Sequence, residues 1–281
     1  MTKRVIKIFF IIILIFTLSA FPVLADDANE LEEVVIEEDE KNEIEASASS
    51  DTKPTINSRR YAVYDRLSGR CIYGKDENKQ TAMASTTKIM SAVIIVENCN
   101  LEDIVTVTAK AAGVGGSRLG LHTDDKISVN DLLYGLMLRS GNDAAVALAI
   151  HTAGSVEEFA NLMNQKAEVL GLTNTHFVSP HGLDNSEHYT TAYELAKITD
   201  YALKNETIAK IVKTKTTTIS INGNPMQINN TNELLGNVEG VYGVKTGFTN
   251  NAGRCLVTSV KRGDMDLIIL VLGADTRKDR A

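Results

Sequence analysis

The 281-residue chain can hold one large domain or two modest ones, and its 43% hydrophobic and 23% charged residues are ordinary values for a globular protein. The net charge is −7, and the acidic excess is concentrated in residues 26–45. The chain after Glu45 has balanced charges, which excludes the strongly basic character of a nucleic-acid-binding protein.

Residues 1–25 have the layout of a secretory signal peptide. Basic residues come first, an apolar run follows at 8–18, and a small-residue exit ends at Ala25. A permanent membrane anchor needs about 20 apolar residues, and Pro22 and Asp26 cut this run short. We therefore predict an exported, extracytoplasmic protein, either in the cell envelope or secreted.

Residues 26–58 form a second segment of different composition. Residues 26–45 are rich in Asp and Glu and contain one basic residue, Lys41. A Ser/Ala/Thr-rich stretch continues to Ser58. Such a segment repels itself and has too little apolar surface to fold alone. We predict an acidic, disordered linker here and a folded domain over residues 59–281.

The cysteines, Cys71, Cys99 and Cys255, are odd in number and lack metal-ligand spacing. We predict small buried side chains, no essential disulfide, no metal and no cofactor.

The folded part begins with a predicted hairpin, with strands at 61–65 and 70–73. Residues 84–97 are predicted to form a helix that is apolar nearly all round, which indicates burial on most sides. Ser85 would lie at the N-terminus of this helix. A short strand is expected at 104–108, and a glycine-rich loop follows at 113–120.

The middle of the chain reads as a helical block. Capping patterns at Ser128, Ser155 and Thr191 each precede an amphipathic run, and a further alanine-rich helix is expected from Asp143 to His151. After about residue 213 the apolar period changes to two, which predicts strands at 216–221, 241–245, 254–260 and 266–272. This order predicts an α+β fold, with one antiparallel sheet built from both chain ends, a helical block between them, and helices on the faces of the sheet.

The stretch Ser85–Lys88 places a hydroxyl and an amine on one face of a helix start. A serine needs a base within hydrogen-bond reach to act as a nucleophile. Lys88 can serve only if burial or a nearby cation lowers its pKa, and Lys245 is a candidate for that cation.

Two later motifs could complete a site. Ser140–Asn142 lies in a break between helices, where a hydroxyl can relay a proton and an amide can donate and accept hydrogen bonds. Lys245–Gly247 ends a predicted strand, where a cation and a hydroxyl can hold a carboxylate and a glycine permits close approach. Each motif alone is common by chance. The ordered set is typical of class A β-lactamases and penicillin-binding proteins, although the middle motif in this chain is Ser-Gly-Asn.

From about Arg60 onward, the chain resembles the D-alanyl-D-alanine carboxypeptidases, the low-molecular-weight penicillin-binding proteins that trim peptidoglycan stem peptides. The resemblance extends beyond the three motifs to residues 61–70, 179–183, 189–192 and 245–255. It implies a fold similar to that of β-lactamases and DD-peptidases. It also implies removal of the terminal D-alanine from a peptidoglycan pentapeptide through a serine acyl-enzyme, with β-lactams as inhibitors.

The resemblance also implies a role for each matching residue. The catalytic residues would be Ser85 as nucleophile, Lys88 as its base and Ser140 as proton relay. Asn142 would contact the substrate. The substrate-binding group would be Lys245, Thr246 and Arg280 around the terminal carboxylate, Gly247 beside the substrate backbone, and the N–H groups of Ser85 and Phe248 as oxyanion hole.

Two other functions remain open from the residues. A class A-like β-lactamase needs a glutamate on a loop after the Ser-x-Asn helix, and Glu168 instead falls on a predicted helix face. A non-catalytic module that binds β-lactams or the cell wall is the second alternative. His181, His188 and Asp184 could suggest a metal site or a triad, but they match no zinc spacing, and the resemblance makes this segment structural or cleft-lining.

The resembling family usually continues with a terminal helix, often followed by a β-rich domain and an amphipathic membrane anchor. This chain stops at Ala281. We therefore expect a domain that lacks its C-terminal helix, with membrane association only through a C-terminal part beyond Ala281.

Overall fold

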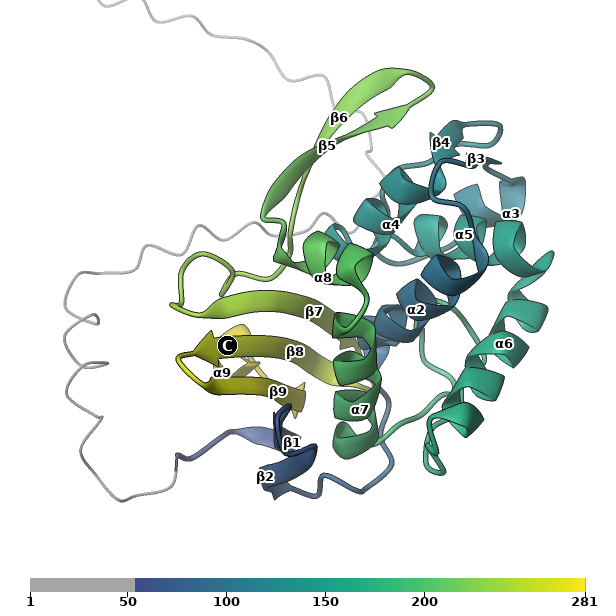
Figure 1. The fold of residues 1–281 in the computed structure, drawn as a ribbon. Helices are drawn as coiled ribbons and strands as arrows, with labels where there is room; N and C mark the ends of the chain where they lie inside the picture. The colour runs from purple at the N-terminus through teal and green to yellow at the C-terminus, as the bar shows by residue number, and fades with distance from the viewer. Residues whose placement is uncertain (1–53, 281) are drawn as a thin grey trace, which may run out of the picture. The chain divides into compact units, whose positions relative to one another are not determined.

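The centre of the fold is a five-stranded antiparallel sheet with strand order β2-β1-β9-β8-β7 (Figure 1). The structure is a computed structural model that describes residues 54–280. The predicted signal peptide and most of the predicted linker lie outside the described residues. The strands are β1 (Ser58–Asp65), β2 (Arg70–Lys75), β7 (Val241–Thr249), β8 (Gly253–Arg262) and β9 (Met265–Ala274). Because β1 pairs with β9, both ends of the domain meet in one sheet, and the predicted α+β architecture is confirmed.

The helical block lies between these two groups of strands in the sequence. Its members are η1 (Ala84–Thr87), α2 (Lys88–Asn98), α3 (Ala109–Ala112), α4 (Val129–Leu138), α5 (Asn142–Ala153), α6 (Val156–Val169), α7 (Ala192–Leu203) and α8 (Glu206–Lys213). The side-chain oxygens of Ser128, Ser155 and Thr191 each accept a hydrogen bond from a backbone N–H three residues on, as the capping patterns predict. A last short helix, α9 (Arg277–Arg280), packs against β8 and β9.

Two local predictions were wrong, and one helix was missed. Strand β5 (Thr216–Ile221) does not join the main sheet but pairs with β6 (Asn224–Asn229). These two strands form a hairpin, because Asn222 and Gly223 both have positive φ and close a tight turn between them. Helix α8 was not predicted, although Asn205 caps it through two backbone N–H groups. The Lys-Thr-Gly motif lies within β7, which continues to Thr249.

The predicted strand at 104–108 is shorter than expected. It forms β3 (Ile104–Thr106), which pairs with β4 (Lys126–Ser128) in a two-stranded sheet of its own.

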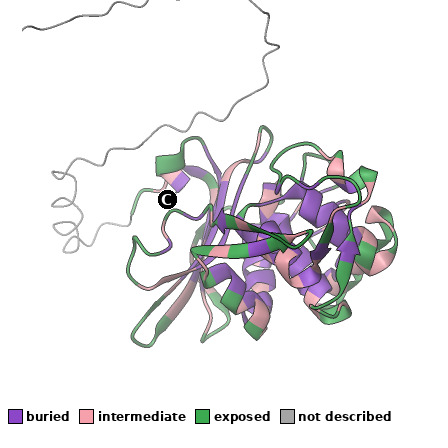
Figure 2. Cartoon of the chain, turned by 90° about the horizontal axis from the view of Figure 1, so that it is seen from above, coloured by how far each residue is buried: buried purple, intermediate pink, exposed green. Residues whose placement is uncertain are grey.

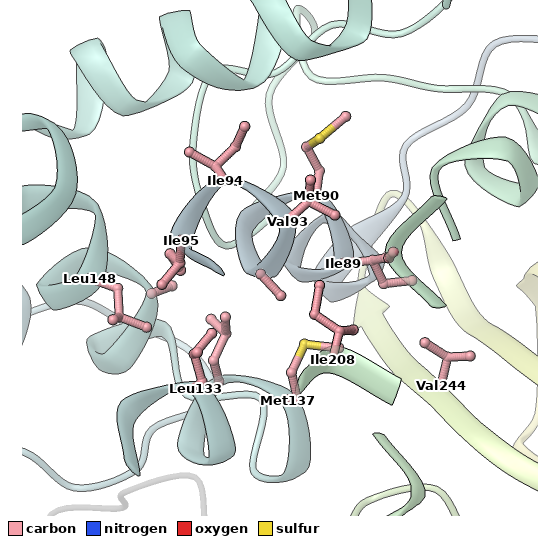
Figure 3. Close-up of a cluster of buried hydrophobic side chains, with 14 of the residues drawn as sticks. Ile89, Met90, Val93, Ile94, Ile95, Leu133, Met137, Leu148, Ile208 and Val244 are labelled. Carbon is pink, nitrogen blue, oxygen red and sulfur yellow. The ribbon is translucent and has the colours of Figure 1, made fainter. Parts of the chain in front are cut away.

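Helix α2 occupies the centre of the hydrophobic core. Every residue from Lys88 to Ile95 is buried, and Ile89 and Val93 lie among side chains of α4, α5, α8 and β7 (Figure 3). Burial of an aliphatic side chain of this size contributes about 1.5–3 kcal/mol relative to exposure. Buried residues, purple in Figure 2, are concentrated in the interior of the domain. The buried part of α2 includes its first residue, Lys88.

Within residues 54–280, no helix combines the length and apolar character that crossing a bilayer would require.

Candidate active site

Ser85 lies in the 3-10 turn that precedes α2. It is partly exposed, whereas its neighbours from Met83 to Ile95 are buried. The preceding Ala84 has φ +47°, a left-handed conformation that costs a non-glycine residue about 1 kcal/mol or more. Surrounding contacts must hold this turn, and they present the Ser85 hydroxyl at the surface of an otherwise buried segment.

Lys88 is fully buried beneath Ser85. Its Nζ contacts Ser85 Oγ at 2.9 Å, Asn142 Oδ1 at 2.7 Å and the carbonyl oxygen of His181 at 3.0 Å. The two carbonyl oxygens can only accept hydrogen bonds, so a neutral amine donates its two protons to them and directs its lone pair at Ser85 Oγ. The geometry is therefore that of a base and its nucleophile.

The charged state of Lys88 is disfavoured by its surroundings. Burial holds the pKa of Lys88 well below its usual range, and the nearby charge of Lys245 lowers the pKa further. The carboxylate of Asp143 acts in the opposite direction. The sequence-based expectation that Lys245 depresses the pKa of Lys88 is correct in direction, although burial is the larger cause.

The Ser140–Asn142 motif occupies the predicted break between α4 and α5. Asn142 Nδ2 donates to the carbonyl oxygen of Gly115 at 2.7 Å, which fixes the amide so that Oδ1 faces Lys88. Ser140 has φ +60° and is buried at the same break. In residues 54–280 its hydroxyl makes no hydrogen bond to Ser85 or Lys88, so the motif contacts the base through Asn142.

Asp143 is a site residue that the sequence did not single out. Its fully buried carboxylate accepts hydrogen bonds from the N–H groups of Leu119, Gly120 and Leu121 at 2.8–3.1 Å. These bonds tie the glycine-rich loop to the start of α5. An acidic residue directly after Ser-Gly-Asn was the available signal, but its partners lie more than 20 residues away in sequence.

Strand β7 lies directly against the Ser85 turn. A Cβ atom added at Gly247 would come within 3.0 Å of Ser85 N and 3.1 Å of Ala84 Cβ, so only glycine fits here without a shift. Beside it, Lys245 is buried and donates to the carbonyl oxygen of Thr246 at 2.9 Å. Burial, followed by the charge of Arg280, lowers the pKa of Lys245 to about 7.

Cationic groups gather at this edge of the site. Arg280 is buried on α9, and its Nε has no hydrogen-bond partner among the described residues. Arg254 lies opposite Phe248 in the β7–β8 register, with its guanidinium 5.0 Å from the ring centre of that half-exposed side chain. Together with Lys245, these donors form a region suited to an anion such as a carboxylate.

The histidines do not form a triad with Ser85. It is the backbone carbonyl of His181, and not its ring, that contacts Lys88, while the ring Nδ1 accepts from Leu183 N. Asp184 accepts from Thr249 Oγ1 and Asn251 N, which ties this loop to the β7–β8 turn. No cluster of His, Cys, Asp and Glu among residues 54–280 has the arrangement of a metal site.

Comparisons with known proteins agree with this geometry. The family model described as D-alanyl-D-alanine carboxypeptidase matches residues 47–276. The chain is 40% identical over 224 residues to D-alanyl-D-alanine carboxypeptidase DacF of Bacillus subtilis, covering 78% of this chain and 58% of DacF. It is 38% identical over 245 residues to the D-alanyl-D-alanine carboxypeptidase of Streptomyces sp. (strain K15), covering 81% of this chain and 84% of the K15 protein.

Solved structures resemble the chain to a similar degree. The crystal structure of the Streptomyces K15 DD-transpeptidase matches with a TM-score of 0.77 and 37% identity, over 82% of this chain and 94% of that one. The D-alanyl-D-alanine carboxypeptidase DacD of Francisella tularensis matches with a TM-score of 0.75 and 28% identity, over 82% and 69%. The chain thus covers 84% of the K15 carboxypeptidase sequence and 94% of the crystallised K15 chain, but less than two thirds of DacF.

Proposed function

The chain belongs to the D-alanyl-D-alanine carboxypeptidase family, and we propose that it is a serine-type carboxypeptidase that removes the terminal D-alanine from peptidoglycan stem peptides. One observation carries this proposal. A buried Lys88, with its pKa held well below the usual range, lies 2.9 Å from the hydroxyl of the partly exposed Ser85. This pair can generate a serine nucleophile at neutral pH without a histidine.

The first step is acylation of Ser85. Neutral Lys88 takes the hydroxyl proton as Oγ attacks the carbonyl carbon between the last two D-alanines. The N–H groups of Ser85 and Phe248 would stabilise the oxyanion. The peptide C–N bond then breaks as protonated Lys88 returns its proton, through the hydroxyl of Ser140, to the departing amine, and D-alanine leaves. Water, deprotonated by the same base, hydrolyses the ester and restores the enzyme.

The substrate is held through its terminal carboxylate. Lys245, Thr246 and Arg280 would bind this group, and Gly247 would let the peptide backbone lie along β7. The closeness of Gly247 to Ser85 supports this placement, because it puts the carboxylate subsite next to the nucleophile. The unpartnered, buried Nε of Arg280 is a further donor in that region.

Penicillins and other β-lactams would acylate the same serine and leave slowly. A fast β-lactamase would need a glutamate that activates the deacylating water, and Glu168 is exposed on α6. This observation favours the carboxypeptidase over the lactamase. The complete Ser-Lys-Asn contact set favours either enzyme over a non-catalytic binding module.

The whole chain has three parts in this proposal. Residues 1–25 direct export as a signal peptide, residues 26–58 are an acidic linker, and residues 59–281 form the DD-peptidase domain. Peptidoglycan lies outside the cytoplasm, so export brings the enzyme to its substrate in the cell envelope. The apolar run at 8–18 and the small residues before Asp26 support the export signal.

Labelling with a fluorescent penicillin tests the proposal. The wild-type chain should form a covalent adduct that Ser85→Ala cannot form, and it should release D-alanine from a pentapeptide. An adduct that turns over in seconds would favour the lactamase. Stable labelling without D-alanine release would favour the non-catalytic module.

A further inference from the structure

A buried chain of hydrogen bonds runs from His188 to the turn that carries Ser85. His188 Nε2 lies 2.8 Å from Thr87 Oγ1, and Thr87 Oγ1 donates to the carbonyl oxygen of Ala84 at 2.8 Å. We propose that His188 is a positioning residue for the nucleophile, acting through Thr87 on the backbone turn before Ser85. The proposal deepens the proposed function and rests on it.

The direction of each hydrogen bond in this chain is determined. Val178 N–H donates to His188 Nδ1 at 3.1 Å, so Nδ1 is the unprotonated nitrogen. Nε2 therefore carries the proton and donates it to Thr87 Oγ1. The hydroxyl of Thr87 then has its own proton free for the Ala84 carbonyl. Because each donor has one acceptor, these hydrogen bonds have a single possible arrangement.

The turn at Ala84 needs such support. Its φ of +47° is unusual for a residue with a Cβ, and it sits directly before the nucleophile. A loop closes over the same carbonyl group, since a Cβ added at Gly182 would lie 2.0 Å from Ala84 O and 2.5 Å from Thr87 Oγ1. Gly247 of β7 lies against Ser85 N. The turn is thus packed against both this loop and β7, with Thr87 as the hydrogen-bonding contact.

His188 is built to stay neutral. It is 3% exposed, and the ring of Phe177 meets it edge-on with centroids 5.7 Å apart. Burial, with smaller contributions from the charges of His176 and Lys88, lowers the pKa of His188 to about 4. A neutral ring whose Nδ1 lone pair is already occupied cannot act as a general base. Its role is therefore to orient Thr87.

The test measures the rate of acylation by a fluorescent penicillin in the 281-residue chain. Thr87→Val and His188→Leu each break the hydrogen-bond chain, and each should slow acylation about 10-fold or more, because a small displacement of a nucleophile is costly. The non-covalent affinity for penicillin should stay within about 2-fold of wild type. Thr87→Ser and His188→Gln keep a hydroxyl and an N–H donor in place, and should restore most of the rate.

A matched control separates positioning from general destabilisation. Thr199 is equally buried, and its hydroxyl also donates to a backbone carbonyl, that of Leu195 at 2.7 Å in α7. Thr199→Val should lower the melting temperature by a similar amount and leave the acylation rate unchanged. His188→Leu combined with Thr87→Val should acylate no more slowly than the worse single variant, because both act through one chain.

Two results would overturn the proposal while leaving the function intact. One is wild-type acylation rates in folded Thr87→Val and His188→Leu. The other is losses that multiply in the double variant, which would mean that the two residues act independently. A wild-type chain that forms no penicillin adduct would instead overturn the proposed function itself.

Discussion

Asn142 Oδ1 accepts a hydrogen bond from Lys88 Nζ at 2.7 Å, so the Ser-Gly-Asn motif contacts the base of this site and not its nucleophile. The other end of the amide is held by the carbonyl oxygen of Gly115. Asn142 therefore fixes the position of the amine and accepts a hydrogen bond from one of its protons. This makes the charge at position 142 a control on the protonation of Lys88.

Asn142→Asp should move the acylation pH profile to higher pH. A carboxylate beside Lys88 favours the protonated amine, so it raises the pKa of Lys88 and less base is present at a given pH. We expect acylation at neutral pH to fall about 100-fold and to recover partly as the pH rises. Penicillin acylation rates measured across pH check this. An unchanged lower limb would show that Lys88 is not the base.

Lys245→Arg should remove the decline at alkaline pH from the pH profile of D-alanine release. The pKa of Lys245 is lowered to about 7 in the free protein, so its charge, and with it the attraction for a carboxylate, declines as the pH rises through that value. A guanidinium stays charged over the whole range. The measurement is kcat/KM against pH for both chains. The same alkaline limb in both would assign it to another group.

Gly247→Ala should impair acylation while the domain remains folded. The added methyl group would lie 3.0 Å from Ser85 N and 3.1 Å from Ala84 Cβ, so β7 and the nucleophile turn must move apart. We expect a loss of about 10-fold or more in acylation rate. Stopped-flow labelling gives the rate, and thermal melting monitors the fold. A wild-type rate would mean that the distance between β7 and Ser85 does not matter for catalysis.

Asp143→Asn should destabilise the domain by about 2–4 kcal/mol. The buried carboxylate accepts three N–H groups of the glycine-rich loop, and an amide would turn an N–H against at least one of them. Urea unfolding measures the loss. The lower limb of the pH profile for acylation should also shift to lower pH. The charge of Asp143 favours protonated Lys88, and the substitution removes that charge. A shift to higher pH would contradict this.

His181→Ala should leave acylation within about 3-fold of wild type. Lys88 uses the backbone carbonyl of His181, which the substitution keeps, and the ring makes its hydrogen bond to Leu183 N, with Nδ1 as acceptor. Penicillin labelling of the folded variant is the measurement. Loss of labelling with a normal melt would establish a catalytic role for the ring.

The sequence by itself determined the local features of this protein. The caps at Ser128, Ser155 and Thr191 and the hairpin of β1 and β2 depend on residues a few positions apart, so their patterns were sufficient. The same holds for Ser85 and Lys88, which one helical turn brings together. The motif set and its order indicated the family.

Only the tertiary structure decided how the site works. The third partner of Lys88 is a carbonyl oxygen 93 residues away. The apolar helix pattern indicated burial, but the complete burial that lowers the pKa of Lys88 depends on the elements packed around α2. The same is true of the bond between His188 and Thr87, which joins residues 101 positions apart. Backbone acceptors carry no side-chain signal, and desolvation depends on the whole core. The sequence therefore predicted the chemical groups of the site and the direction of the effect of Lys245 on Lys88, but not the long-range contacts that hold these groups in place.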